Sequence, residues 1–221
     1  MNGPSGRLEY LIDKPRTGAK PRAAVVFGHP HPQFGGTMHT KAVFQGAKGL
    51  VRIGCVVLRF NFRGVGMSEG QFDEGQGEAA DYRTALDFIH AQYPDIPLWA
   101  AGFSFGAWVG LETGAADPRV STLIGIAPPV PMVSKGVNGA EPEETVRRPY
   151  YSFPNTLETT KPKFFVQGDL DDLCPLKDML AFYSRLKEPK ELVVIDGASH
   201  LFEGKTQEVG EALEELLGDF E

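Results

Sequence analysis

Cysteine and long apolar runs are scarce in this sequence of 221 residues. Its 2 cysteines, Cys55 in an apolar run and Cys174 in an acidic loop, are too few for the disulfide framework of a small secreted protein. No apolar run approaches the ~20 residues that span a bilayer, and no basic segment followed by an apolar one opens the chain as a signal peptide would. We therefore expect a cytoplasmic protein without membrane insertion, in which both thiols are reduced and structural.

An excess of positive charge is also missing. Lys and Arg number 22 against 29 Asp and Glu, which gives a formal net charge of -7 at pH 7. This balance argues against nucleic acid and anionic membranes as partners and favours a small neutral or cationic substrate. The 42% hydrophobic and 23% charged residues are typical of a globular protein. We expect one domain over residues 1–221, acting as a monomer or a homodimer.

Short runs rich in Val, Ile and Phe alternate with helical patterns. The runs cover residues 23–28, 55–60, 97–103, 122–127, 163–168 and 191–196. Their continuous hydrophobicity is typical of strands covered on both faces. Apolar periodicity predicts helices over residues 78–92 and 206–218. The β-α-β-α order predicts an α/β fold with a mostly parallel sheet of about 6–8 strands between helices. Residues 7–12, "RLEYLI", are expected to add an antiparallel edge strand.

The stretch from residue 128 to residue 162 does not follow this alternation. It is rich in proline and shows no sustained hydrophobic period. Long irregular segments of this kind often act as lids over a site, and otherwise are surface insertions. We expect residues 128–162 to form a short lid or an insertion within the single domain.

The pattern G-x-S-x-G occurs twice, around Ser68 and around Ser104. In a nucleophile elbow the serine occupies a turn so sharp that glycine is needed on both sides, between a strand and a helix. Ser104 in "GFSFG" has this context, because a strand-like run precedes it and a helix-like run follows. Ser68 in "GMSEG" follows glycine-rich sequence and precedes no helix. We predict that Ser104 is a nucleophile and Ser68 a loop residue.

An elbow serine needs a base, and the base needs an acid to orient it. A histidine, His200, follows the last predicted strand in "GASHLF", and an acidic loop, "VQGDLDDLCP", follows the strand before. Both lie at the carboxyl ends of strands, where open α/β sheets place their sites. His90 falls within a predicted helix and His39 just before one, so we expect surface or structural roles for them. The loop offers three acids: Asp169, Asp171 and Asp172.

Five motifs, "HPHP…GGT", "NFRGVGMSEG", "GFSFGA", "QGDLDDLCP" and "GASHLF", stand in this order over about residues 20–205. In this the chain resembles the small bacterial serine hydrolases with little cap of the α/β-hydrolase superfamily. The resemblance implies an α/β-hydrolase fold and a pattern G-x-x-D-x-x-x-P that carries the acid. Placed on Gly168 and Pro175, the pattern selects Asp171 and leaves its two neighbouring aspartates as capping or solvated residues.

The resemblance implies acyl transfer by a serine carboxylesterase, with no cofactor and no metal. His200 would accept the proton of Ser104 as the hydroxyl attacks an ester of a small or medium acyl group, and Asp171 would hold the imidazole in the right tautomer. Water would later release the acyl group. The developing oxyanion needs two preorganised donors, and one should be the backbone N–H of Phe105, the residue after the nucleophile.

The stretch "GHPHPQFGG" raises a metal site as an alternative. His-x-His at the end of a strand begins the metal sites of several metal-dependent hydrolases, and His29 and His31 would be the ligands here. Zinc sites need three protein ligands. The acid that a motif of the form His-x-His-x-Asp-His would place at Gln33 is absent, which argues against a metallohydrolase.

Within an α/β hydrolase the same loop would supply the second oxyanion donor. Pro30 and Pro32 have no N–H to donate, so the candidates are His31, Gln33 and Phe34. The resemblance favours the backbone N–H of His31, which lies two residues after the strand-end histidine. Its imidazole is then expected to be incidental.

Other residues near these motifs have more than one interpretation. Arg63 in "NFRGVGMSEG" follows a strand and either binds a substrate carboxylate or supports tight glycine turns, and the resemblance favours the structural role. Phe34 and the pair Tyr150 and Tyr151 are candidates for lining an acyl pocket, although aromatic residues often belong simply to the core.

The same triad serves thioesterases, lactonases, peptidases and acyltransferases, and the sequence does not separate these from a carboxylesterase. The alternative of a different class is a non-catalytic protein that binds a ligand on a hydrolase scaffold. The presence of Ser104, Asp171 and His200 in order argues against it, since a receptor needs none of the three. A small-molecule ester is therefore the expected partner.

Overall fold

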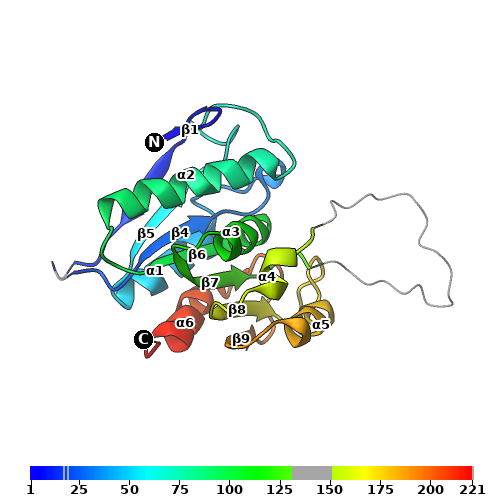
Figure 1. The fold of residues 1–221 in the computed structure, drawn as a ribbon. Coiled ribbons are helices and arrows are strands. Elements are labelled where there is room, and N and C mark those ends of the chain that lie inside the picture. The colour runs from blue at the N-terminus through cyan, green and yellow to red at the C-terminus, as the bar shows by residue number, and fades with distance from the viewer. Residues whose placement is uncertain (17, 19, 131–150, 221) are drawn as a thin grey trace.

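A seven-stranded sheet forms the centre of the computed structural model, which describes residues 1–16, 18, 20–130 and 151–220 (Figure 1). Every neighbouring pair of strands is parallel except β3 with β5. The α/β fold and the predicted size of its sheet are confirmed. In their order across the sheet the strands are β3 (Tyr10–Asp13), β5 (Val56–Phe60), β4 (Ala24–Gly28), β6 (Leu98–Phe103), β7 (Val120–Ile126), β8 (Lys163–Gly168) and β9 (Lys190–Ile195).

The predicted antiparallel edge strand is β3, which pairs with β5 at one end of the sheet. It begins at Tyr10 rather than at Arg7. The difference arises because Gly6–Arg7 form β2, which pairs with β1 (Asn2–Gly3) in a separate two-stranded sheet.

Helices cover both faces of the sheet (Figure 1). Along β4, Val25 and Phe27 belong to the hydrophobic core of one face, and Ala24 and Val26 to that of the other. Successive side chains of a strand point to opposite faces, so a strand covered on both sides needs apolar residues at every position. The first face is packed by α1 (Lys41–Arg52) and α6 (Thr206–Leu217), and the second by α2 (Gln76–Gln92), α3 (Phe105–Ala116) and α5 (Leu176–Arg185).

The two helices predicted from apolar periodicity are α2 and α6. Their predicted apolar faces are buried: Tyr82, Ala85, Leu86 and Ile89 in α2, and Val209, Ala212, Leu213, Leu216 and Leu217 in α6. In the part of the chain that the structure describes, no helix combines the length and the apolar character needed to cross a bilayer.

The predicted lid or insertion, residues 128–162, is described only at its two ends. Residues 131–150, which include the pocket candidate Tyr150, lie outside the described residues. The second end carries α4 (Pro154–Glu158), where the backbone N–H groups of Asn155 and Thr156 donate to the Glu112 carboxylate at 3.1 and 2.9 Å. These bonds attach the end of the segment to α3, the helix that follows Ser104.

The carboxyl ends of four parallel strands meet along one edge of the sheet. β4 leads into "GHPHPQFGG", β6 into Ser104, β8 into the acidic loop and β9 into the loop of His200. Parallel strands of one sheet end on the same side, and ligand sites of open α/β sheets lie there. The fold therefore gathers motifs that are far apart in the chain.

Candidate active site

Ser104 stands alone between β6, which ends at Phe103, and α3, which begins at Phe105. Its φ of 53° lies in the left-handed region, a strained conformation for a residue with a side chain. Its backbone N–H donates to the carbonyl of Ile126 on β7 at 2.9 Å, and its own carbonyl accepts from Ala107 and Trp108 at 2.9 and 3.1 Å. The turn is thus held on both sides, which keeps the serine in its strained position.

Both glycines of the "GFSFG" turn are required by close backbone contacts. A Cβ on Gly102 would lie 2.1 Å from the carbonyl oxygen of Gly106. A Cβ on Gly106 would lie 2.4 Å from the carbonyl carbon of Gly28, the last residue of β4. Real Cβ atoms do not approach backbone so closely, so the sequence forms this tight turn only with glycine at both positions.

The structure brings the three predicted triad residues together. The Nε2 atom of His200 lies 2.9 Å from the Ser104 hydroxyl oxygen, and its Nδ1 atom lies 2.8 Å from Oδ2 of Asp171. All three side chains are buried. Since a carboxylate only accepts hydrogen bonds, Nδ1 carries the ring proton and Nε2 is left to accept the proton of the serine. This is the tautomer that a general base for Ser104 requires.

Of the three aspartates in the acidic loop, Asp171 is the one that bonds His200. Its Oδ1 atom accepts the backbone N–H groups of Leu173 and Cys174 at 3.0 and 2.7 Å. Its Oδ2 atom accepts the side-chain amide of Gln167 at 3.0 Å in addition to the imidazole. Four donors therefore surround one carboxylate, and together they fix its orientation toward the imidazole.

Gln167 is a residue that the sequence reasoning missed. It lies near the end of β8, fully buried, and its amide also donates to the carbonyl of Cys174 at 2.7 Å. Gln167 thereby joins the strand to the loop that carries Asp171. The available signal was a polar residue directly after the apolar residues "FFV" of the run "KFFVQG", because a buried amide needs a partner.

The segments that carry the two predicted oxyanion donors are neighbours, since the rings of His31 and Phe105 lie 5.1 Å apart. Of the three candidates in the β4 loop, Gln33 donates its N–H to Nδ1 of His31 at 3.2 Å and Phe34 donates to the His31 carbonyl at 3.1 Å. Within the described chain, the N–H of His31 donates to no protein acceptor, and neither does that of Phe105 at the first position of α3. Both are thus available to a ligand.

The imidazole of His31 has structural contacts of its own. Besides accepting the N–H of Gln33, it lies in an aromatic cluster with Phe34, Phe72 and Phe105, at ring-centroid distances of 4.6, 5.0 and 5.1 Å. The sequence did not show that Phe72, from the loop after β5, packs against this histidine, and these contacts leave open the prediction that the ring takes no part in catalysis. Burial lowers the pKa of the His31 ring.

His29 has no nitrogen to offer a metal ion. Its Nδ1 atom lies 2.6 Å from the carbonyl oxygen of Pro30, and its Nε2 atom accepts the backbone N–H of Phe62 at 3.1 Å. The side chain is fully buried, and this burial lowers its pKa to about 4. The ring is therefore neutral at pH 7 with both nitrogens occupied, which argues against a site built on His29 and His31.

One group of side chains in the described chain has metal-ligand spacing, and it overlaps the triad. The ligand atoms of Asp171, Cys174 and His200 lie within 4.8 Å of one another, all buried. The carboxylate and the imidazole already hydrogen-bond each other there. Neither cysteine forms a disulfide, and burial raises the pKa of the Cys55 thiol to about 12, as expected for a reduced and unreactive side chain.

The proposed pocket residues lie in different surroundings. Phe34 is 83% exposed beside His31, so it does not form the wall of an enclosed pocket. Tyr151 packs edge-on against Trp108 at 5.0 Å, and burial raises its pKa to about 12. It also lines an apolar cavity of about 520 Å³ between α4 and α5. Of the two candidates that the structure describes, Tyr151 lines this cavity and Phe34 does not.

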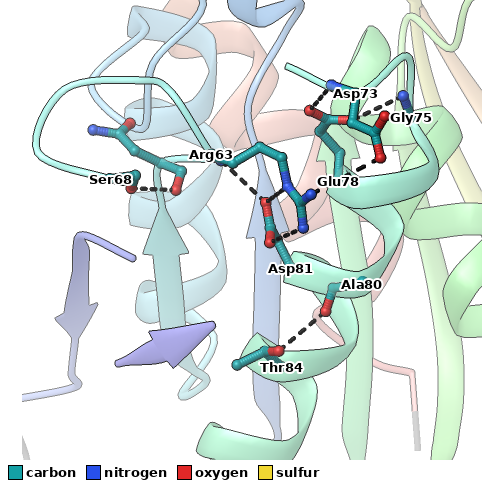
Figure 2. Close-up of polar contacts among 9 residues, drawn as sticks. Arg63, Ser68, Asp73, Gly75, Glu78, Ala80, Asp81 and Thr84 are labelled. Carbon is teal, nitrogen blue, oxygen red and sulfur yellow. Dashed lines mark hydrogen bonds and ion pairs between the residues drawn. The ribbon is translucent and has the colours of Figure 1, made fainter. Parts of the chain in front are cut away.

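Arg63 forms a buried ion pair with Asp81 (Figure 2). Its Nε and Nη2 atoms donate to the Asp81 carboxylate of α2 at 2.9 and 2.8 Å, and its backbone N–H donates to the same group at 3.0 Å. Glu78 of α2 accepts the N–H groups of Asp73 and Gly75 at 3.0 and 2.8 Å. The guanidinium thus donates to a carboxylate of the protein itself, in agreement with a structural role.

Known proteins resemble this chain in both sequence and structure. A family model described as serine aminopeptidase, S33, matches residues 19–142. An uncharacterised protein of Rickettsia prowazekii is 35% identical over 98% of this chain and 87% of its own length. An α/β serine hydrolase homologue from Coxiella burnetii is 37% identical, with a TM-score of 0.83 over 98% of this chain and 95% of that one. An α/β serine hydrolase without lid from Xanthomonas campestris is 33% identical, with a TM-score of 0.82 over 97% of this chain and 90% of that one.

Proposed function

This chain belongs to the serine aminopeptidase family within the α/β-hydrolase superfamily, and we propose that it hydrolyses carboxylic esters of small or medium acyl groups through an acyl-enzyme on Ser104. The observation that carries the proposal is the continuous chain of hydrogen bonds from Ser104 through His200 to Asp171, at 2.9 and 2.8 Å. These distances lie within the range that general-base catalysis requires.

The geometry supports a mechanism in two halves. His200 Nε2 takes the proton of Ser104 while the hydroxyl oxygen attacks the ester carbonyl carbon, and Asp171 stabilises the imidazolium that forms. The tetrahedral intermediate then expels the alcohol, which receives the proton from His200. In the second half His200 takes a proton from water as the water oxygen attacks the acyl carbon, and the tetrahedral intermediate then expels Ser104, whose oxygen receives that proton from His200.

The oxyanion of each intermediate is assigned to two backbone N–H groups. Those of His31 and Phe105 are unpaired with any described protein acceptor and belong to neighbouring segments. A preorganised donor of this kind typically lowers the barrier by about 3 kcal/mol. The φ of 53° at Ser104 supports the assignment, because a strained, fixed turn holds the nucleophile and the following N–H in one geometry.

A covalent label tests the proposal. The protein is treated with a fluorophosphonate probe, with and without a chelator, and digested for mass spectrometry. We expect one label per chain on Ser104, unaffected by the chelator, and none in Ser104→Ala. Ser68→Ala is the matched control, since it removes the serine of the other G-x-S-x-G pattern, and it should label fully. An unlabelled wild-type protein whose activity the chelator abolishes would refute a serine hydrolase.

A substrate panel separates ester hydrolysis from the other reactions of the same triad. The p-nitrophenyl esters of acetate, butyrate and octanoate are compared with an acyl thioester, a γ-lactone and an aminoacyl p-nitroanilide. The highest kcat/KM is expected for acetate or butyrate. A preference for the anilide would instead assign aminopeptidase chemistry, and faster transfer to an added alcohol than to water would assign acyl transfer.

A further inference from the structure

The peptide group between Pro30 and His31 is held by a buried imidazole. Nδ1 of His29 lies 2.6 Å from the carbonyl oxygen of Pro30. Nε2 of the same ring accepts the N–H of Phe62, at the start of the loop after β5, at 3.1 Å. The N–H of His31 belongs to the same peptide group as the Pro30 carbonyl. His29 therefore contacts one end of the group whose other end is assigned to the oxyanion.

Chemistry decides the tautomer of this ring. A backbone N–H can only donate, so Nε2 of His29 is an acceptor without a proton. The single ring proton is then on Nδ1, which donates to the carbonyl of Pro30. Burial keeps the ring neutral at pH 7, since it lowers the pKa of His29 to about 4. The imidazole thus connects the N–H of Phe62 to the carbonyl of Pro30.

Holding the carbonyl oxygen also holds the N–H. In a trans peptide the two groups point in opposite directions, and in the described chain the one cis bond is Glu188–Pro189. The N–H of His31 consequently points away from the His29 ring. A hydrogen bond to the carbonyl also polarises the peptide and strengthens its N–H as a donor. The imidazole contributes both the direction and the strength of this N–H.

The loop lies directly against the nucleophile turn. A Cβ on Gly106 would lie 2.5 Å from the carbonyl oxygen of His29, so the backbone of the loop touches the segment that follows Ser104. A Cβ on Gly36 would lie 2.1 Å from the Pro30 oxygen, so that oxygen is closely packed on a second side. A small rotation of the peptide would therefore be felt at the oxyanion position.

The other end of this connection is anchored to α2. Phe62 packs edge-on against His29 and Phe105 at ring-centroid distances of 4.8 and 5.6 Å. The next residue, Arg63, donates its backbone N–H and its guanidinium to the buried Asp81 (Figure 2). The N–H that His29 accepts thus belongs to a segment fixed by a buried ion pair. This gives the imidazole a rigid support.

We propose that His29 is a positioning residue of the oxyanion hole, whose ring holds the Pro30–His31 peptide with its N–H directed at the tetrahedral intermediate. The inference rests on the proposed function, because it concerns the intermediates of that reaction. It assigns a role in the chemistry to a histidine that never touches the substrate, and it assigns to the segment of Arg63 the support of that role.

Three substitutions separate positioning from plain packing. His29→Phe retains a ring and removes both hydrogen bonds. His29→Asn places an amide donor where Nδ1 stood, and His29→Gln places an amide oxygen where Nε2 stood. If the bond to Pro30 is what matters, Asn restores activity and Gln does not, whatever their relative stabilities. His39→Asn is the matched control, since His39 is an exposed residue outside the site.

The measurements are kcat and KM with p-nitrophenyl butyrate, the inhibition constant of phenylboronic acid, and the melting temperature. All rates are divided by the concentration of active sites titrated with the fluorophosphonate. Loss of one oxyanion donor typically costs 10²–10³-fold in kcat. We expect about a 100-fold loss in His29→Phe with KM within threefold, a parallel weakening of boronate binding, and recovery to within about tenfold of wild type in His29→Asn.

The outcomes distinguish this inference from the proposed function. If wild-type protein is not labelled at Ser104 and hydrolyses no ester, the proposed function itself is wrong. If wild type is active and His29→Phe retains its kcat per active site, or if Gln restores activity better than Asn, the positioning role is wrong while the function stands. A fall in melting temperature with unchanged boronate binding also overturns it.

Discussion

The two G-x-S-x-G segments of this chain have the same glycine spacing and opposite surroundings. The hydroxyl of Ser104 lies 2.9 Å from an imidazole that is held by a carboxylate. The hydroxyl of Ser68 donates to the carbonyl of Asn61 at 2.7 Å, the bond drawn at Ser68 in Figure 2. It also accepts the N–H of Glu9 at 2.9 Å, so it satisfies two backbone groups. One serine has a base as its partner, and the other joins Glu9, the residue before β3, to Asn61, the residue after β5.

The difference lies in the elements on either side. Ser104 separates a strand from a helix and adopts a φ of 53°, whereas Ser68 lies in a loop whose neighbouring glycines, Gly66 and Gly70, take the positive φ values of 56° and 89°. In the first segment the serine adopts the positive φ and is strained, and in the second the glycines adopt it without strain. A motif with glycine on both sides therefore indicates a sharp turn, and only the flanking secondary structure indicates a nucleophile.

The largest effect on kcat is expected when the hydroxyl of Ser104 is removed, and removal of the hydroxyl of Ser68 is the comparison. Ser104→Ala is expected to lower kcat by about 10⁴-fold or more, since the triad acts as a unit, with little change in melting temperature. Ser68→Ala is expected to keep kcat per active site and to lower the free energy of unfolding by about 1–3 kcal/mol, because it leaves a backbone N–H and a carbonyl unpaired. Ester hydrolysis assays and urea denaturation measure both. Similar kcat values for the two variants would contradict the assignment of Ser104 as the nucleophile and Ser68 as a structural residue.

A pH titration of stability probes the link between the two regions. Phe62, at the start of the loop that carries Ser68, donates to His29, whose backbone lies against Gly106 of the Ser104 turn. The pKa of His29 is lowered by burial to about 4, against about 6.5 in an unfolded chain. Between these values the unfolded chain binds the proton and the folded chain does not, so stability falls as pH falls. The contribution of His29 to this loss should reach about 3 kcal/mol near pH 4.

The check is denaturant unfolding of wild type and His29→Phe at pH 7 and at about pH 4.5. His29→Phe should lose less of its free energy of unfolding over this interval than wild type does, because it lacks the group that titrates. Equal losses in the two proteins would show that His29 is already charged, or not buried, in the folded state.

The smallest effect is expected at Gln167, which supports the triad without touching Ser104. Gln167→Leu removes the amide donor to Asp171, and one hydrogen bond to a charged group is worth about 1.5 kcal/mol, so kcat should fall about tenfold. The exposed Gln207→Leu on α6 is the control and should leave kcat unchanged. If Gln167→Leu retains its full kcat per active site, the backbone donors of Leu173 and Cys174 suffice to hold the carboxylate.

Much of the fold follows from apolar patterning, because strands buried on both faces are continuous apolar runs and amphipathic helices repeat at 3.6 residues. Element ends were less predictable: β7 begins at Val120 rather than at residue 122, since register with β6 rather than local sequence decides where pairing starts. The hydrogen bonds of Gln167 and the packing of Phe72 against His31 depend on contacts between segments distant in the chain, which no local pattern records.

The sequence by itself determined which residues could do chemistry here. Glycine spacing, strand ends and motif order selected Ser104 and His200, because a sharp turn and a parallel sheet are encoded locally. Tertiary structure alone decided the hydrogen bonds at and around the site. These are the four donors to Asp171, the backbone partners of the Ser68 hydroxyl, and the partners of both ring nitrogens of His29. The physical reason is that a hydrogen bond depends on where partners from distant segments lie, and only the packed fold sets those positions.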